Sequence, residues 1–426
     1  MVADTKYPPS VKAGKPILGE TPTSWTRGSL KNHLNLEQRK VKVEDNKEYD
    51  LVTVKRSRGG VVRREHLLGK QISVKSQFSL KEGDFLISKR QIVHGACGIV
   101  PAHLDGSIVS NEYSIFTAKD SFDLTYLRYL SETLYFQQTC FHSSIGVHIE
   151  KMIFKLDNWF KWDFNLPPLP EQHKIAKILS TWDKAISTTE KLIETSMQQK
   201  KALMQQLLTG KKRLVNPENG KAFEGDWEEV KLGELGTVIS GGTPSTSSPE
   251  CWDGDIHWVT PTDITKLRTQ TIQNTTRKIT AVGLRNSSAK LIPARSLLIC
   301  TRATIGELAI TATEMCTNQG FKNIIPSACT DVAFLYYLIQ SSKHSLIAKA
   351  SGSTFLELSK KDFENIRFHI PSFKEQQKIA SVLTAADKEI ELLEAKLAHF
   401  KQEKKALMQQ LLTGKRRVQV DEMEVA

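Results

Sequence analysis

The sequence predicts an α+β protein in which two globular domains of mixed helix and strand alternate with two long helices. The segment KKALMQQLLTGK occupies residues 200–211 and occurs again at residues 404–415. The match continues upstream without a gap, so that Glu171 corresponds to Glu375 and Gly210 to Gly414 at one constant offset. An internal repeat dictates architecture, and two copies are too few for a solenoid. The repeat therefore indicates a duplicated unit in which one long helix closes each half.

The composition bounds the partners and the compartment. The 426 residues suffice for two or three domains, and a formal charge of +12 favours a polyanionic partner, most simply nucleic acid, over a basic protein without one. Six cysteines without a CxxC pair fit apolar core positions in a reducing compartment. No apolar run approaches the ~20 residues that cross a bilayer, and the N-terminus resembles no signal peptide. We therefore expect a cytoplasmic protein that contacts no membrane.

The first domain is expected over residues 25–168, after an N-terminal arm at residues 1–24 that lacks periodicity. β-Branched and apolar runs predict strands within it, and Gly59-Gly60 and Asp105-Gly106 mark turns. The leucine spacing predicts one helix over residues 124–134. Strands followed by a helix indicate a mixed α+β domain. The predicted strands are residues 51–55, 85–88 and 107–110.

The two long helices are expected over residues 169–213 and 372–417. Pro167 and Pro168 stop the preceding strand, since proline suits a helix start but not a strand ladder. From there apolar residues recur in sevens, which is the pattern of a coiled coil. Gly210 and Gly414 are typical left-handed helix caps. The predicted seam, also the candidate docking surface, consists of Leu179, Trp182, Ile186, Ile193, Leu203, Leu207, Leu383, Ile390, Leu393, Leu397, Phe400, Leu407 and Leu411.

Polar residues interrupt this seam. Lys200 and Lys404 occupy matched seam positions, where they either fix the helix register or extend to solvent. The first helix is also the more polar, at Thr189 and Ser196. If a pseudo-twofold axis crosses the helices, they run antiparallel and hold the two domains at opposite ends of a spacer. Alternatively, the helices only close a core or mediate dimerisation.

The second domain is expected over residues 222–371. Its start, DWEEVKLGEL from Asp226, parallels SWTRGSLKNHL from Ser24, and SLLICTR from Ser296 matches DFLISKR from Asp84. A strand is predicted over residues 256–260. The SGGTPSTSSPE segment from Ser240 is interpreted as a flexible or DNA-facing loop, since no helix follows to complete a phosphate cradle. The helices repeat closely, whereas the domains match only in outline.

Catalytic motifs are missing from the sequence. There is no GxxxxGK[ST] loop, GxSxG elbow, HExxH motif or metal-ligand spacing of histidines. An adenine methyltransferase is expected to carry a glycine-rich cofactor loop and an Asp/Asn-Pro-Pro-aromatic motif, and neither Pro-Pro pair has that context. We therefore predict no catalytic and no metal-ligating residue, which leaves binding as the function.

The candidate DNA contacts are mainly cations. Arg and Lys bind phosphates, and Arg can also contact guanine bidentately. Each cation alone can equally be a solvated surface charge, but clusters within duplicated domains favour a DNA-facing role. Asn111 and the pair Asn318-Gln319 could read adenine or could satisfy local backbone. The candidates are Lys55, Arg56, Arg58, Arg63, Arg64, Lys89, Arg90, His94 and Asn111 in the first domain, and Lys266, Arg268, Arg277, Arg285, Arg302 and Lys322 in the second.

Over nearly its whole length the chain resembles the specificity subunit of type I restriction-modification systems. The resemblance rests on FLISKRQIVHGACGIVPAHLDGSIVSNEYSIF from Phe85, on SGGTPS…PECWDGDIHWVTPTDI in the second domain, and on both LPEQHKIA/KEQQKIA…LLTGK helices. It implies two target-recognition domains, each reading one half of a bipartite double-stranded DNA site. It also implies an antiparallel coiled coil that sets the half-site spacing.

The resemblance further implies the partners. Two modification subunits that carry S-adenosylmethionine would dock on the helices and methylate adenine, and restriction subunits with an ATP- and Mg-dependent motor and nuclease would join them. No cofactor is expected on this chain. The second domain lacks a counterpart of the Arg63-Arg64 turn, so the two domains are expected to read different sequences. The N-terminal arm has no equivalent in the second half; it touches DNA, touches a partner or is disordered.

We therefore predict a non-catalytic DNA-specificity subunit. The alternative is a structural coiled-coil scaffold with non-specific nucleic-acid binding. A third interpretation, a self-sufficient methyltransferase or nuclease, would require the chain alone to modify or cut DNA.

Overall fold

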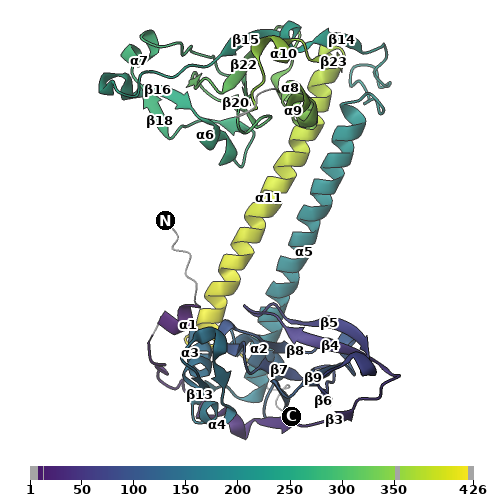
Figure 1. The fold of residues 1–426 in the computed structure, drawn as a ribbon, viewed down its shortest axis with the longest axis vertical. Coiled ribbons are helices and arrows are strands. Elements are labelled where there is room, and N and C mark those ends of the chain that lie inside the picture. The colour runs from purple at the N-terminus through teal and green to yellow at the C-terminus, as the bar shows by residue number, and fades with distance from the viewer. Residues whose placement is uncertain (1–7, 13, 351–355, 421–426) are drawn as a thin grey trace. The chain divides into compact units, whose positions relative to one another are not determined.

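The chain forms two compact units in a computed structural model that describes residues 8–12, 14–350 and 356–420 (Figure 1). Unit 1 comprises Met1–Thr189 with Lys396–Ala426, and unit 2 comprises Glu190–Ala395. The division falls within both long helices, α5 (Leu169–Leu207) and α11 (Phe373–Leu411). Each unit therefore contains one globular domain, the beginning of one long helix and the end of the other.

Both long helices stop at the predicted glycine caps, at Leu207 and Leu411, and so end a few residues before the predicted bounds of 213 and 417. Gly210 and Gly414 have φ angles of 69° and 68°, so each adopts the left-handed cap conformation that glycine accommodates without strain. Each cap also packs against the tryptophan that opens the domain of its own unit, Trp227 for Gly210 and Trp25 for Gly414. The repeated Thr-Gly thus stops each helix and seats its end on a domain.

The two domains share a frame of strands. In unit 1, β1 pairs antiparallel with β13, and a four-stranded sheet has the order β2-β10-β7-β8. Unit 2 repeats this with the pair β14-β23 and the order β15-β22-β19-β20, to which β17 adds an edge. In unit 1 these strands are β1 (Thr26–Ser29), β2 (Leu34–Glu37), β7 (Phe85–Ser88), β8 (Cys97–Ile99), β10 (Tyr113–Ala118) and β13 (Asp163–Leu166). In unit 2 they are β14 (Glu228–Lys231), β15 (Gly236–Ser240), β17 (Thr271–Ile272), β19 (Leu297–Cys300), β20 (Leu308–Thr311), β22 (Phe321–Pro326) and β23 (Arg367–Ile370).

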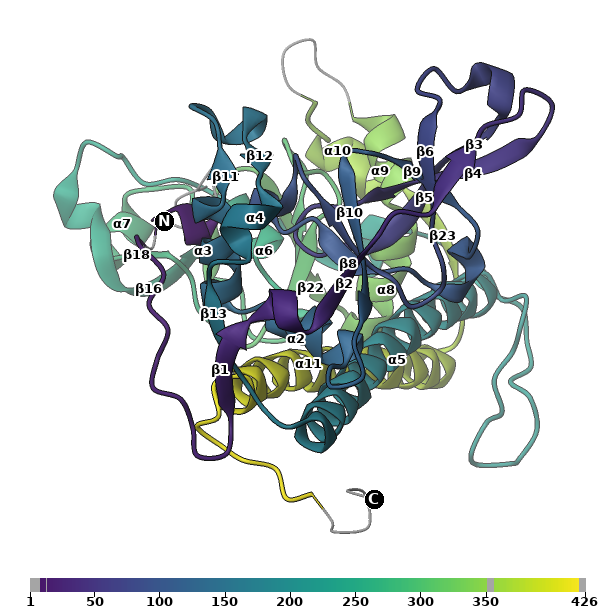
Figure 2. The ribbon, with the colours of Figure 1, turned by 90° about the horizontal axis from the view of Figure 1, so that it is seen from below.

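The remaining strands differ between the domains. Unit 1 adds a five-stranded sheet of order β3-β6-β9-β4-β5, which projects from its frame (Figure 2), and a β11-β12 hairpin. Unit 2 adds a three-stranded sheet of order β18-β16-β21. These strands are β3 (Lys40–Lys42), β4 (Glu48–Val54), β5 (Val61–Leu68), β6 (Ser76–Ser79), β9 (Ile108–Ser110), β11 (Ser144–Ile145), β12 (Ile153–Phe154), β16 (Trp252–Val259), β18 (Arg277–Ile279) and β21 (Cys316–Thr317).

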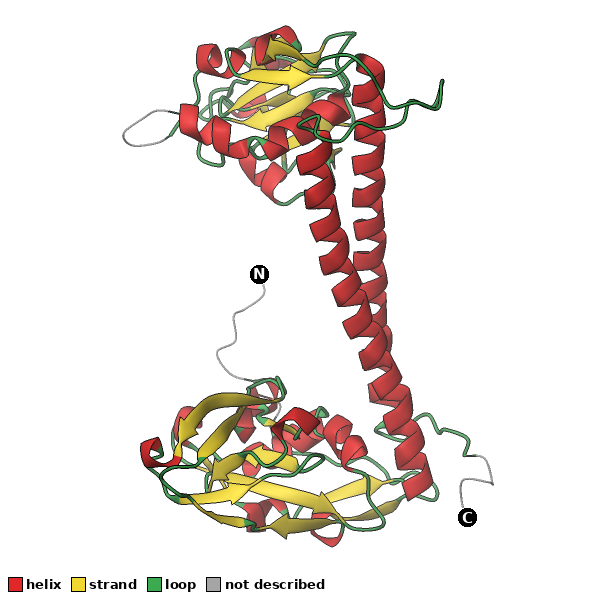
Figure 3. Cartoon of the chain, turned by 90° about the vertical axis from the view of Figure 1, so that its right-hand side faces the viewer, coloured by secondary structure: helices red, strands yellow, loops and turns green. Residues whose placement is uncertain are grey.

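Short helices pack beside the strands in each unit (Figure 3). The single helix predicted over residues 124–134 is wrong, because α2 ends at Leu130 and α3 begins at Leu134. Thr133 causes the break, since its hydroxyl accepts a hydrogen bond from Phe136 N and caps a new helix. The short helices are α1 (Pro9–Lys12), α2 (Leu124–Leu130), α3 (Leu134–His142), α4 (Leu156–Trp159), α6 (Pro261–Thr265), α7 (Ala281–Arg285), α8 (Val332–Ser341), α9 (Lys343–Lys349) and α10 (Lys360–Glu364).

The N-terminal arm lies along its own domain where the structure describes it. Gln138 donates a hydrogen bond to Gly14 O, and Asn165 donates to Gly19 O and Glu20 O. Residues 1–7 and 13 of the predicted arm lie outside the described residues.

The core of each domain includes both long helices. In unit 1, Ile175 and Leu179 of α5 join the same buried cluster as Leu411 of α11. In unit 2, the matching residues of the other repeat take these places, since Leu383 of α11 clusters with Leu207 of α5. The residues that carry the repeat are therefore those that close the two cores.

A matched glutamine ties the start of each helix to its domain. Gln172 accepts a hydrogen bond from Asp123 N and donates one to Pro167 O. Gln376 repeats this with Asp331 N and Pro371 O. Both glutamines are 1% exposed, so these hydrogen bonds satisfy amides that burial would otherwise penalise.

A matched arginine connects each helix end to the start of the other helix. Arg417 donates from Nε and Nη2 to the two oxygens of Glu171, at 2.8 and 2.6 Å. Arg213 forms the same fork with Glu375, at 2.7 Å for both bonds. Bidentate pairing of an arginine with a buried carboxylate fixes the geometry of each contact.

The lysines on the seam form matched ion pairs. In unit 1, Lys404 contacts Asp183 at 2.7 Å, and the Tyr129 hydroxyl donates to the same carboxylate. Burial tends to raise the pKa of Asp183, but the hydrogen bonds from Lys404 and Tyr129 outweigh it and leave that pKa below its ordinary value.

Unit 2 repeats this arrangement with Lys200, Asp387 and Tyr337. In each unit the pair joins the beginning of one helix to the end of the other, and the residue numbers run in opposite directions along the two helices. The helices are therefore antiparallel within each unit, and the lysines fix the register.

These pairs predict a position-specific loss of stability. Lys200→Met would leave the carboxylate of Asp387, whose side chain is 19% exposed, without its cation. We expect the free energy of unfolding to fall by about 1–3 kcal/mol, between the values for surface and buried pairs. Calorimetric unfolding of the purified chain measures the change.

The neighbouring exposed lysine supplies the control. Lys201→Met removes the same charge one position away, and we expect it to change stability by less than about 0.5 kcal/mol. Equal losses from the two variants would contradict the register role.

Candidate nucleic-acid interface

In unit 1 most candidate cations lie on the sheet that the second domain lacks. Arg63 and Arg64 are exposed on β5, and Lys55 and Arg56 are exposed in the turn between β4 and β5. This turn is tight, because Ser57 has a left-handed φ of 53°. The hairpin therefore presents a cluster of positive charge on a domain-specific element.

Carboxylates partly neutralise several of these cations. Arg56 pairs with Glu150 at 2.5 Å, and Arg63 pairs with Asp50 at 2.8 Å. Outside the hairpin, Arg90 pairs with Glu112. Arg64 has only a loose contact with its neighbour Glu65, at 3.6 Å. Lys55 and Arg64 are therefore the least neutralised cations of this hairpin.

Two candidates in unit 1 are corrected by their burial. The His94 ring is 7% exposed and faces the Glu150 carboxylate, and burial lowers its pKa. Arg58 is half-buried and donates from Nε to Ser131 O at 3.2 Å. Both side chains therefore make contacts within the domain, and His94 is the more buried of the two.

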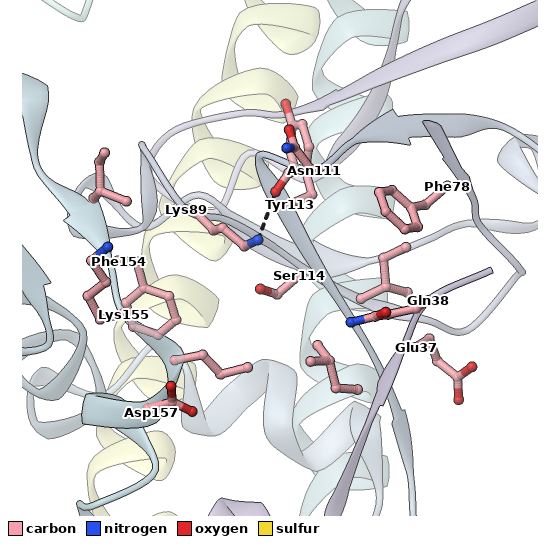
Figure 4. Close-up of a pocket in the computed structure, with 14 residues that line it drawn as sticks. Glu37, Gln38, Phe78, Lys89, Asn111, Tyr113, Ser114, Phe154, Lys155 and Asp157 are labelled. Carbon is pink, nitrogen blue, oxygen red and sulfur yellow. Dashed lines mark hydrogen bonds between the residues drawn. The ribbon is translucent and has the colours of Figure 1, made fainter. Parts of the chain in front are cut away.

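A cavity of about 480 Å³ opens at the other candidates of unit 1 (Figure 4). Lys89 donates from Nζ to the backbone oxygen of Asn111 at 2.7 Å, and burial lowers its pKa. The side-chain amides of Asn111 and Gln38 are exposed and have no hydrogen-bond partner among the described residues. The aromatic rings of Phe78 and Tyr113 line the cavity, together with Lys155 and the carboxylates of Glu37 and Asp157. The site therefore combines free amides with apolar rings and charges of both signs.

In unit 2 the exposed candidates gather around its own extra sheet. Arg277 lies on β18, Arg285 ends α7, and Lys266 follows α6. Arg268 is exposed on a groove of about 380 Å³ beside Lys200 of α5. The candidate set thus occupies domain-specific elements in this unit too.

Other candidates of unit 2 are engaged within the protein. Lys322 is 6% exposed, and burial lowers its pKa, so the predicted DNA contact is corrected to a residue of the interior. Arg302 lies 3.9 Å from the Glu357 carboxylate. Asn318 accepts a hydrogen bond from Gly320 N, which is the local backbone role that the sequence left open.

The glycine-rich loop from Ser240 is not flexible at its glycines. Gly241 and Gly242 are buried, and a Cβ on Gly242 would lie 2.3 Å from Ala289 N. These glycines allow close packing between backbones rather than a phosphate cradle. Residues 245–247 are exposed.

The predicted seam residues lie at buried or half-buried positions along both helices. In unit 1, the rings of Trp182 and Phe400 pack edge to face with centroids 5.6 Å apart. A residue occupied in this way is not exposed to a partner. The seam residues therefore pack the two helices together, and the exposed faces of the helices lie elsewhere.

Among the described residues, no group of three His, Cys, Asp or Glu side chains could hold a metal ion. Within the described ranges, no helix is both long and apolar enough to span a membrane. Five cysteines are buried as expected, whereas Cys329 is exposed.

Sequence reasoning missed several residues of these sites. Gln38 and Lys155 lie far apart in the sequence, in segments without a motif, and only folding brings them to one cavity. Trp252 and Trp258 appeared only as part of a family motif, although they lie beneath Arg277.

Fold and site together define a class: a duplicated binding protein, in which one repeated frame of strands and helices carries two different cation-bearing sheets. Sequence comparison identifies the family. The profile of the type I restriction modification DNA specificity domain matches twice, at residues 32–195 and 224–402. The chain therefore belongs to the family of type I restriction-modification specificity subunits.

Individual relatives agree with this assignment. The chain is 39% identical over 168 residues to the type I restriction enzyme MjaIX specificity subunit of Methanocaldococcus jannaschii, across 39% of each protein. It is 31% identical over 171 residues to the EcoR124I/EcoR124II specificity subunit of Escherichia coli, across 38% of this chain and 42% of that one. These alignments thus span about two-fifths of the relatives.

A solved structure shows the same fold along the chain. The HsdS subunit from Thermoanaerobacter tengcongensis superimposes with a TM-score of 0.54 at 19% identity. This match covers 93% of the present chain and 98% of the other.

The exposure of the cations and their pairing with carboxylates predict which of them contribute to DNA affinity. Replacing both Lys55 and Arg64 with Ala should weaken DNA binding about tenfold and reduce the slope of log K against log salt by roughly 2, since each phosphate contact contributes about 0.9. Fluorescence anisotropy of the purified chain with a labelled DNA duplex, over a salt series, measures both quantities.

Lys322→Met is the contrasting variant, because Lys322 is buried. We expect it to leave the affinity within about twofold and the salt slope unchanged. A comparable loss from Lys322→Met would show that the sorting by exposure is wrong.

Proposed function

We propose that this chain is the DNA-reading and assembling subunit of a type I restriction-modification complex and performs no chemistry itself. Each domain reads one half of a bipartite DNA site, and the paired helices set the spacing between the halves. Two methyltransferase subunits with S-adenosylmethionine modify adenines, and restriction subunits with ATP and Mg cleave unmodified DNA.

One observation carries this proposal. The frame of β1-β13 and β2-β10-β7-β8 is repeated as β14-β23 and β15-β22-β19-β20, whereas the β4-β5 hairpin with Lys55, Arg56, Arg63 and Arg64 and the β16-β18 pair with Arg277 are not repeated. A repeated frame with different reading surfaces suits two half-sites of different sequence. A merely structural scaffold would need no such division.

The cavity in unit 1 suits base reading. Free amides of Asn and Gln can bond adenine bidentately, and apolar side chains can contact the thymine methyl group. Gln38 and Asn111 offer such amides, and the half-exposed Phe78 and the exposed Leu36 and Ile153 offer apolar contacts. Lys89 and Lys155 would contact phosphates at its rim.

The outer faces of the helices suit two equivalent partners. Gln198, Ala202, Gln205 and Thr209 form an exposed stripe along α5, and Gln402, Ala406, Gln409 and Thr413 repeat it identically on α11. An earlier exposed stripe, Lys184, Thr188, Lys191 and Thr195, differs from its counterpart at three of four positions. Because core packing does not constrain exposed residues, the identical stripes favour a shared external partner.

Methylome sequencing tests the reading role. A host that expresses this chain with its methyltransferase partner should show adenine methylation at one bipartite motif. Replacing residues 25–165 with the first domain of another family member should change one half of the motif and leave the other half and the spacer unchanged. Both halves should change if the two domains read DNA jointly, which would contradict the proposal, as would methylation without any motif.

The docking stripe gives a stoichiometric prediction. Ala202→Arg introduces a bulky charge into one stripe and leaves the stripe on α11 intact. Native mass spectrometry of the reconstituted complex should then show one bound methyltransferase in place of two, and Ala202→Arg with Ala406→Arg should show none.

Thr195→Arg is the matched control, since Thr195 is exposed on α5 at a position that differs from His399 in the other repeat. We expect this variant to retain both partners. Loss of a partner from the control, or two partners on the double variant, would exclude the stripes as docking surfaces.

A further inference from the structure

The extra sheet of unit 2 places one arginine over the ring of Trp252, next to Trp258. The guanidinium carbon of Arg277 lies 3.7 Å from the centroid of the Trp252 ring and 5.4 Å from that of Trp258. The two tryptophans pack edge to face, with centroids 5.0 Å apart and an interplanar angle of 82°. Trp252 and Trp258 are 8% and 4% exposed, whereas Arg277 is exposed.

The backbone fixes this arrangement. Trp258 lies directly opposite Arg277 in the antiparallel pairing of β16 and β18. The register shifts between Trp252 and Ile256, and Asp253 has a left-handed φ of 58°. Such a bulge redirects a side chain, and here it accompanies the placement of Trp252 against the guanidinium.

The tryptophans are themselves held in place. Trp252 donates from Nε1 to Ser245 O and Trp258 donates to Gly242 O, both at 2.9 Å. The close packing of Gly242 against Ala289 fixes the loop that supplies these acceptors. The platform under Arg277 is therefore rigid.

The donors of the Arg277 guanidinium are not used by the described part of the protein. Among the described residues, no hydrogen bond or ion pair engages this guanidinium, although Asp253 and Asp255 lie on the paired strand β16. Arg213, Arg367 and Arg417, by contrast, each bond a carboxylate. A stacked guanidinium with free donors presents a planar fork to an external pair of acceptors.

We propose that Arg277 reads a guanine in the half-site of the second domain, by a bidentate contact to guanine O6 and N7. This inference rests on the proposed DNA-reading function. Phosphate oxygens are the other paired acceptors on DNA, but a phosphate contact tolerates a mobile cation. A fork fixed in one plane is what discrimination between bases requires.

Methylome sequencing with Arg277→Lys tests the assignment in the assembled complex. Lysine keeps the charge but loses the planar fork. We expect one G·C position in the second half-site to become degenerate, with preference over the other bases reduced about tenfold or more. Every other motif position should remain unchanged. Trp252→Phe keeps a smaller ring in the core and should relax the same position partially.

Arg295→Lys is the matched control. It makes the same substitution at an exposed arginine of the same domain that is not among the candidate DNA contacts, and it should leave the motif unchanged. Thermal unfolding of the two arginine variants should match the parent chain, because both arginines are exposed and their replacement empties no core.

Three outcomes overturn the assignment. An unchanged motif with evenly lower methylation would identify a phosphate contact, and an unchanged motif at full methylation would exclude any contact. A second half-site without a G·C pair would also exclude guanine reading. If the parent chain itself supports no bipartite motif, the proposed function fails, and that result is distinguishable from failure of the Arg277 assignment alone.

Discussion

The burial of each helix end in a domain core is the constraint on which the rest of the structure depends. Leu207 and Leu208 enter the core of unit 2, and Leu411 and Leu412 enter that of unit 1. Burying one leucine contributes about 1.5–3 kcal/mol, so each Leu-Leu pair is a substantial part of the marginal stability of a domain. Neither core is complete without residues from both long helices. The antiparallel pairing within each unit follows from this requirement, and the lysine–aspartate pairs then select one register.

This constraint explains why the repeat is uneven. Residues that close a core, form the bidentate arginine–carboxylate pair or cap a helix are identical in both copies. Glu171, Gln172 and Gly210 correspond to Glu375, Gln376 and Gly414. The extra sheets do not close a core against the long helices, and they differ between the domains in strand number and order. A duplicated protein with this division can change what a domain binds without changing how the domain is attached.

The sequence predicted the frame well, because the repeat indicates duplication and the heptad spacing indicates paired helices. The seven-residue spacing and the left-handed caps of Gly210 and Gly414 are confirmed. The break at Thr133 was missed, since leucine periodicity continues across it and only a side-chain cap reveals it. The residues of the candidate sites were harder to predict from the sequence. Lys322 and Arg277 are both cations in strand-rich segments, yet one is buried and the other rests on tryptophans. Only the fold determines which is which.

Carboxylates beside many of the cations reduce the positive charge that is free to attract DNA. A net charge of +12 suggests a uniform attraction to DNA, but Arg56, Arg63 and Arg90 each lie within 3 Å of an acidic group. Such pairs weaken non-specific attraction, because a phosphate must compete with an existing partner. They also hold guanidinium groups in defined positions. A reading surface gains selectivity when most of its cations are compensated and a few are left free on rigid supports, because free charge alone binds every sequence equally.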